Sequence, residues 1–161
     1  MIFDLKNEGD VDLVNRSIQG KIVGLTSGSY DLFHHLHLVY LKRCRRYCDM
    51  LIVGVDSDDL VRNRKGSHRP LAPEHQRVAI VSDLSCVGAA FILGSVEDFE
   101  EAVRSLSPAM IFKNDEFKEE EVLGRDKAKV IIIPDMVQYS STTQIIEEIL
   151  KRKIPEKINP A

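Results

Sequence analysis

Residues 21–48, KIVGLTSGSYDLFHHLHLVYLKRCRRYC, contain the pattern that decides the fold. The first eight letters form a short apolar run that ends in Ser and Gly, as a buried strand does when it leads into a loop. After the loop, Leu38, Leu41 and Cys44 recur at helical spacing, with basic residues around the other side. The stretch therefore predicts a strand, a histidine-rich loop and an amphipathic helix in succession.

This strand-and-helix unit recurs about five times along the chain. Further apolar strands are predicted at 50–55, 88–93, 109–113 and 129–133, and further helices at 73–84, 96–106 and 141–153. The strands are continuously apolar, which is typical of a parallel sheet covered on both faces. We therefore predict an α/β fold with a Rossmann-like, doubly wound parallel sheet of about five strands. We expect a single domain over residues 1–161, with a capping helix within 1–20 and a tail at 154–161.

Composition and charge narrow the classes of partner. The chain is 43% hydrophobic and 29% charged, with a formal net charge of -3, so it has no general attraction to nucleic acid or to anionic membrane. No apolar stretch approaches the ~20 residues of a membrane span. Three cysteines make no disulfide framework and are interpreted as reduced thiols. We expect a cytoplasmic protein that binds neither nucleic acid nor membrane, with a homodimer as the commonest symmetric assembly.

The loop between the first strand and its helix is the first candidate site. In a doubly wound sheet, ligands bind beyond the carboxyl ends of the strands, which is where this loop lies. His34, His35 and His37 fall within four positions there, and the free N–H groups of a helix start favour a phosphate. The alternative is that these histidines are packed or solvated. Their clustering at the ligand-binding edge favours a functional role.

The loop sequence GSYDLFHHLH resembles the G-x-F-D-x-x-H-x-G-H motif of the nucleotidylyltransferase superfamily. Gly28, Asp31, His34 and His37 fall on matching positions, and Tyr30 stands where Phe is usual. Four later segments are similar to further motifs of the superfamily in the right order: CDMLIVGVDSDD (48–59), KGSHRPLAPEHQR (65–77), IFKNDEF (111–117) and SSTTQII (140–146).

Within that superfamily the chain resembles most the heptose 1-phosphate adenylyltransferase (ADP-heptose synthase) branch. Cytidylyltransferases usually have an Arg-Thr pair shortly before S-T-T, and this chain has Met136 and Val137 at those positions. The resemblance implies transfer of AMP from ATP to a sugar 1-phosphate, heptose-like, with release of pyrophosphate. It also implies Mg²⁺ that arrives with the triphosphate and is coordinated mostly by phosphate oxygens and water.

The resemblance implies a role for each matching position. The catalytic set is His34, His37, Lys65 and Thr142, and the nucleotide-binding set is Ser27, Gly28, Ser29, Tyr30, Asp31, Arg69, Lys113, Ser141 and Thr143. Arg77 is expected to help hold the phosphates, and so are Arg62 and Arg64 of the basic run RNRKGSHR (62–69). That run is expected to form a loop, and the alternative is that its charges are only solvated. Asp31 is expected to order the histidine loop more than to take part in chemistry.

The chain departs from the superfamily pattern at several glycines. Leu36 replaces the Gly between the motif histidines, Asn114 and Asp115 replace two glycines, and Cys48 replaces another. If the pocket keeps the usual geometry, the Leu36 side chain must face away from the nucleotide. Two alternatives stay open: a CTP-dependent cytidylyltransferase for a polyol or amino-alcohol phosphate, and a nucleotide-binding module that has lost turnover.

Overall fold

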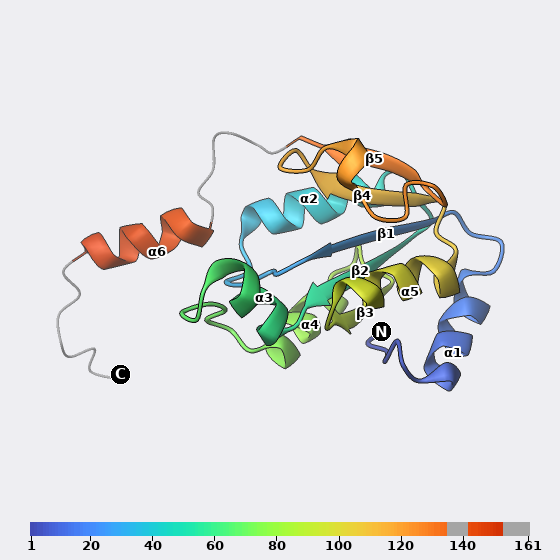
Figure 1. Cartoon of the computed structure of the whole chain (residues 1–161), viewed down its shortest axis with the longest axis horizontal. Helices are drawn as coiled ribbons and strands as arrows, with labels where there is room; N and C mark the ends of the chain where they lie inside the picture. The colour runs from blue at the N-terminus through green and yellow to red at the C-terminus, as the bar shows by residue number, and fades with distance from the viewer. Residues whose placement is uncertain (135–141, 153–161) are drawn as a thin grey trace.

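The computed structural model describes residues 1–134 and 142–152, and Figure 1 shows a central sheet with helices on both of its faces. Five strands form the sheet in the order β3-β2-β1-β4-β5, and every pairing is parallel. Their bounds are β1 Val23–Gly28, β2 Met50–Asp56, β3 Ala89–Leu93, β4 Met110–Asn114 and β5 Lys129–Ile133. The predicted doubly wound α/β fold is therefore confirmed.

Four helices cover the two faces of the sheet, whereas the last helix extends away from it in Figure 1. The helix bounds are α1 Glu8–Ile18, α2 His35–Arg45, α3 Asp58–Lys65, α4 Glu74–Ser82, α5 Val96–Leu106 and α6 Thr142–Lys151, with a short 3₁₀ turn at Glu119–Glu121. Apolar residues of α1 and α5 pack in one core cluster, and those of α2 and α4 pack in another. The sheet separates these two clusters, which gives the three layers visible in Figure 1.

The central strand β2 shows why the apolar runs are continuous. All of its residues are buried, and successive side chains point to opposite faces of the sheet. Ile52 belongs to the cluster under α1 and α5, whereas Leu51 and Val53 belong to the cluster under α2 and α4. Since both faces are covered, every position along the strand favours an apolar side chain.

The strand order also fixes where a ligand can bind. β1 pairs with β2 on one side and with β4 on the other, so the order reverses between β1 and β4. Helices that follow these two strands cover opposite faces, which opens a crevice beyond their carboxyl ends. Gly28 and Asn114 are the last residues of β1 and β4. The histidine loop begins directly after Gly28, at that crevice.

Two segments differ from the sequence-based expectation. The basic run around Arg62 and Lys65 was expected in a loop, but it forms helix α3, whose start is capped by Ser57 Oγ accepting from Leu60 N at 3.1 Å. Residues 1–3 run along the edge strand β3, where Ala90 N donates to Met1 O at 2.9 Å and Phe3 N donates to Ala90 O at 3.0 Å. The first residues thus extend the sheet before α1 begins.

Residues 1–134 and 142–152 include no helix long and apolar enough to cross a membrane. Cys44, Cys48 and Cys86 are buried free thiols, in line with the expectation of reduced cysteines.

Candidate active site

A cavity of about 470 Å³ lies beyond the carboxyl ends of the strands. The histidine loop, the end of α3, the segment after β4 and the start of α6 surround it. Its lining consists of Ser27, Gly28, Ser29, Tyr30, His34, Leu36, His37, Tyr40, Arg64, Lys65, Arg69, Lys113, Asn114, Glu116, Phe117, Thr142 and Thr143. Segments up to 116 residues apart in sequence therefore meet at one place.

The histidine loop holds an unusual backbone conformation. Tyr30 and Leu32 have positive φ angles of 49° and 46°, which non-glycine residues adopt rarely and at a cost of order 1 kcal/mol or more. Gly28 permits this path, because a Cβ at that position would lie 3.2 Å from the Tyr30 ring. A strained loop persists only where its surroundings fix it.

Asp31 provides that fixation. Its carboxylate has no solvent exposure and accepts hydrogen bonds from Leu71 N, Ala72 N and Arg69 Nε, the last at 2.7 Å. Burial alone would raise the pKa of Asp31, but the backbone donors of Ala72 and Leu71, together with Arg69, hold it below its ordinary value. The Asp31 side chain is absent from the cavity lining given above. Asp31 was placed in the nucleotide-binding set, and the structure instead gives its carboxylate the task of ordering the loop.

Arg77 also differs from expectation. It was expected to hold phosphates, but it is 1% exposed and all three of its side-chain nitrogens donate within the protein. The acceptors are the carbonyls of Ser29, Asp56 and Ala72 and the carboxylate of Asp58. Arg77 therefore joins the histidine loop to the end of β2. We call Asp31, Asp56 and Arg77 the floor of the cavity.

His34 and His37 stack on each other at the start of α2, with ring centroids 3.9 Å apart. His37 Nδ1 accepts from the backbone N of His34 at 3.3 Å, in the manner of the third helical residue of a capping box. The proton of His37 therefore lies on Nε2. His37 lines the cavity, so Nε2–H is a donor available to a ligand there.

Thr142 connects α6 to this pair. Its hydroxyl donates to the carbonyl of Asp31 at 3.0 Å, so His34 Nε2, 3.2 Å away, must be the donor to the Thr142 oxygen. This assigns the tautomer of His34 and leaves its buried Nδ1 without a partner in the part of the chain that the structure describes. His34 and Thr142 form one hydrogen-bonded unit between two elements 108 residues apart.

Both histidines are neutral at pH 7. Burial first, and then the nearby His34 and Lys65, lower the pKa of His37 to about 3. Burial, and then His35, lower the pKa of His34. Neutral imidazoles donate hydrogen bonds without a full charge, so formal positive charge in the cavity comes from other groups.

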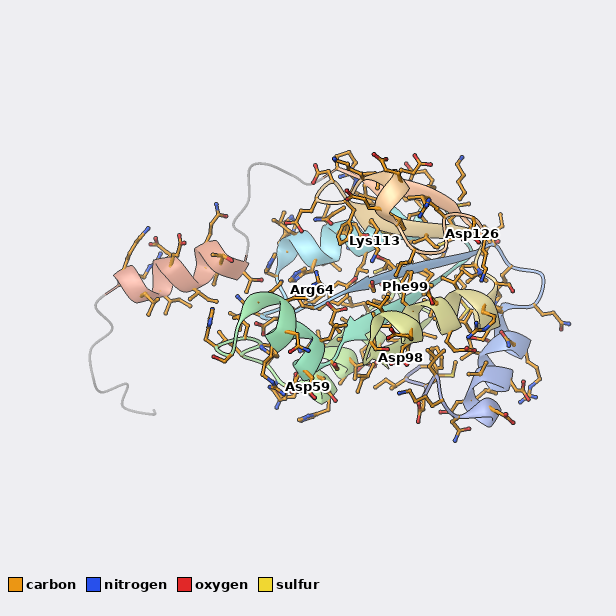
Figure 2. All side chains as sticks on the ribbon, in the orientation of Figure 1. Asp59, Arg64, Asp98, Phe99, Lys113 and Asp126 are labelled. Atoms are coloured by element: carbon orange, nitrogen blue, oxygen red, sulfur yellow. The ribbon has the colours of Figure 1, made fainter. Side chains whose placement is uncertain are left out.

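Lysines and arginines supply that charge. Lys65 Nζ donates to Ser29 Oγ at 3.1 Å, and Lys113 Nζ donates to Ser27 Oγ at 2.8 Å. Lys113 Nζ also lies 4.8 Å from the ring centroid of Phe99 and 5.0 Å from that of Phe117. Figure 2 labels Lys113 and Phe99. Burial lowers the pKa of Lys113 to about 8. We call His34, His37, Lys65, Lys113 and Thr142 the wall of the cavity.

The remaining expected residues fall into three groups. Ser27, Gly28, Ser29, Tyr30, Arg69 and Thr143 all lie in the cavity lining. Ser141 lies outside the described residues. Leu36 is half-buried and belongs to the lining, so this departure from the motif glycine lies at the cavity. That its side chain faces away from a nucleotide stays a prediction.

Sequence reasoning missed several lining residues as ligand-contacting candidates, namely Tyr40, Asn114, Glu116 and Phe117. Arg64 was a candidate in an expected loop, and its helix had a detectable signal, because a cap at Ser57 followed by acidic residues predicts a helix start. Glu116 and Phe117 had none beyond their position after a strand.

This geometry defines the class: an α/β protein with a cavity lined by histidines, lysines and arginines at the switch point of its sheet. The model of the cytidylyltransferase-like family matches residues 25–154. The chain belongs to the cytidylyltransferase-like family, and the expectation of a nucleotidyltransferase from the sequence is confirmed.

Individual relatives agree with this membership. The chain is 34% identical over 137 residues to the bifunctional protein HldE of Helicobacter hepaticus, covering 84% of this chain. It is 36% identical over 138 residues to the HldE of Syntrophotalea carbinolica, covering 83% of this chain. It spans only 28% of the length of each of these two relatives.

Solved structures show the same fold. A lipopolysaccharide core biosynthesis protein from Thermoplasma volcanium superimposes with a TM-score of 0.62 at 28% identity, covering 75% of this chain and all of that one. A pantoate-beta-alanine ligase from Francisella tularensis superimposes with a TM-score of 0.59, covering 94% of this chain and 80% of that one. At 14% identity the second match concerns the fold alone.

Proposed function

We propose that the chain transfers AMP from ATP to the phosphate of a sugar 1-phosphate, heptose-like, and releases pyrophosphate. An acceptor phosphate oxygen forms a bond to the α-phosphorus of ATP, and the bond from that phosphorus to the oxygen leading to the β-phosphorus breaks. The electron pair leaves with pyrophosphate. Such a reaction depends on alignment and on stabilising negative charge around phosphorus.

The observation that carries this proposal is the neutral His34–His37 stack beside the cationic side chains of one cavity. His37 Nε2–H would donate to an oxygen on the α-phosphorus as its charge increases. His34 would hold Thr142, and hence the start of α6, against the same phosphates. Lys65 and Lys113 would neutralise charge on the phosphate groups.

In this proposal Mg²⁺ enters the cavity bound to the nucleotide and not at a site of its own. The described residues contain no group of three or more side chains able to hold a metal ion. Glu116 supplies the carboxylate of the lining, and the carboxylate of Asp56 is paired with Arg64. Phosphate oxygens and water would therefore complete the ion's coordination.

Three features support ATP and a sugar phosphate over the alternatives. The relatives are HldE proteins, one structural neighbour is a lipopolysaccharide core biosynthesis protein, and the chain lacks the Arg-Thr pair typical of cytidylyltransferases. We place the reaction in the cytoplasm, in keeping with three free thiols. Met136 and Val137, which replace that pair, lie outside the described residues.

A second candidate is a nucleotide-binding module without turnover, because Leu36 lines the cavity where the motif has glycine. A nucleotide panel with pyrophosphate detection separates the readings. We expect pyrophosphate release with ATP and a heptose 1-phosphate, and none with CTP. Turnover with CTP alone would replace the adenylyl assignment by a cytidylyl one. Tight ATP binding without pyrophosphate release for any sugar phosphate would favour the module.

A further inference from the structure

Arg64 lies near the end of α3, and its side chain is half exposed. Its Nη1 donates to Asp56 Oδ2 at 2.8 Å, and the residue lines the cavity. Figure 2 labels Arg64 together with Lys113, the lysine whose Nζ donates to Ser27. Arg64 thus reaches the cavity from a helix that sequence reasoning read as a solvated loop.

Asp56 is a rigid anchor for this contact. It is the last residue of β2 and is 2% exposed. Burial raises the pKa of Asp56, and Arg64 is the strongest of the neighbouring cations that oppose the rise. A carboxylate fixed at the end of a central strand therefore holds the guanidinium in place at the edge of the cavity.

Arg62 provides an internal comparison on the same helix. It pairs with Asp59 at 2.8 Å, three residues away on the surface, and both side chains are exposed. Arg62 was expected from the sequence to hold phosphates like Arg64, but it is not part of the cavity lining. The two arginines share helix, charge and ion-pair length, and differ in whether the pair faces the cavity.

Most of the hydrogen-bonding capacity of Arg64 remains for a ligand. A guanidinium has five N–H donors arranged as a fork that matches phosphate oxygens. Within residues 1–134 and 142–152, the bond to Asp56 is the one hydrogen bond that its side chain makes. The three cations Arg64, Lys65 and Lys113 outnumber the two carboxylates of Asp56 and Glu116, so this part of the cavity favours an anion.

We propose that Arg64, positioned by Asp56, is a further substrate-binding residue that donates to a phosphate oxygen on the α3 side of the cavity. The choice of ligand rests on the proposed function. That oxygen belongs either to the triphosphate of ATP or to the phosphate of the sugar acceptor. The two sources share one chemistry, and separate titrations distinguish them.

The test is calorimetric titration of ATP, and separately of glucose 1-phosphate as a sugar-phosphate probe, into wild type, Arg64→Ala and Arg62→Ala. We expect Arg64→Ala to weaken the Kd of one ligand at least tenfold, about 1.4 kcal/mol. Arg62→Ala should stay within twofold of wild type. The ligand whose binding is weakened tells whether Arg64 contacts the triphosphate of ATP or the phosphate of the sugar acceptor. Equal affinities for the two variants would overturn the proposal, as would a wild-type protein that binds neither ligand.

Asp56→Asn tests the positioning role, because it keeps the side-chain volume and removes the charge. We expect Asp56→Asn to weaken binding of the same ligand when introduced into wild type, and to cause no further loss of affinity in the Arg64→Ala background. Independent, additive effects would contradict positioning through Arg64. Arg64→Lys should restore part of the affinity, since it returns the charge without the fork.

These measurements separate the inference from the proposed function. Loss of ATP or sugar-phosphate affinity in Arg64→Ala, with no pyrophosphate release from any substrate pair, would remove the proposed function and keep the binding role. If wild type releases pyrophosphate but Arg64→Ala and Arg62→Ala have equal affinities, the proposed function would stand and the binding role of Arg64 would be lost.

Discussion

Arg77 and Arg64 both contact Asp56, one in the floor of the cavity and one at its edge. Arg77 is 1% exposed and uses all three side-chain nitrogens on protein acceptors. Arg64 is half exposed and uses Nη1 on the Asp56 carboxylate. An arginine whose N–H groups all bond to protein acceptors stabilises the fold, whereas one with unused N–H groups can bind a ligand. We expect the same difference between the floor, whose residues stabilise the fold, and the wall, whose residues bind the ligand.

The strongest test of this contrast is Arg77→Ala. Three backbone carbonyls and the partly exposed Asp58 carboxylate would lose a donor, and acceptors left unsatisfied at about 1–3 kcal/mol each give a loss of roughly 3–5 kcal/mol in total. We expect urea denaturation to show a loss of that size. Lys65→Ala, in the wall, should change the unfolding free energy by about 0.5 kcal/mol or less. Equal losses for the two variants would erase the distinction between floor and wall.

The next largest effect concerns the unit of His34 and Thr142. We expect His34→Ala to lower turnover by about a hundredfold or more, as loss of a donor in such a site typically does. Because the two side chains share a hydrogen bond, Thr142→Ala in the His34→Ala background should cost much less than it costs alone. Steady-state rates of pyrophosphate release measure both. Full additivity would show that the two residues act separately.

Leu36→Gly tests a residue of the cavity lining at which the chain departs from the superfamily motif. The change removes a half-buried side chain and adds a helical glycine, so we expect a loss of about 1–3 kcal/mol in unfolding free energy. Turnover should change less than tenfold if the ligand already fits beside Leu36. A gain of tenfold or more would mean that Leu36 blocks the nucleotide, in favour of the module without turnover.

Lys113 gives the smallest effect, visible as a pH dependence. Burial lowers its pKa to about 8, so the free protein loses this charge as the pH rises through 8. We expect the KM for ATP to rise severalfold between pH 7 and pH 9, and the rise to be absent in Lys113→Arg, which stays charged. A wild-type KM that is flat over this range would exclude Lys113 as a phosphate ligand.

Sequence patterns predicted the framework better than the floor. Continuous apolar runs such as β2 indicate buried parallel strands, and α5 was predicted with its observed bounds, Val96–Leu106. The partners of Asp31 lie 38 or more residues away, and Arg77 reaches Ser29, 48 residues away, which no local spacing encodes. For that reason Arg77 was expected among the phosphate ligands. Its burial, visible only in three dimensions, assigns it to the floor.

Motif matching predicted the wall residues more accurately than the floor residues, because several wall residues lie at or just after the ends of strands. Ser27 and Lys113 end or nearly end β1 and β4, and parallel strand ends meet at one edge of the sheet. The sequence did not separate Arg64 from Arg62 as phosphate candidates, because a run of like charges gives no direction to its side chains. In helix α3 the two side chains point to different places: Arg62 bonds to Asp59 on the surface, and Arg64 bonds to Asp56 at the cavity.

The central claim is that the neutral His37 acts on a phosphate of ATP in addition to capping the start of α2. His37→Ala tests it most directly, with His35→Ala as the matched control, since His35 is exposed and outside the cavity lining. We predict that urea denaturation finds His35→Ala close to wild type and a loss of about 1 kcal/mol in His37→Ala, because the acceptor of His34 N is removed. Pyrophosphate release should fall about a hundredfold or more in His37→Ala and stay near wild type in His35→Ala. An unchanged rate in His37→Ala, or a loss of stability that accounts for its lower rate, would contradict the account.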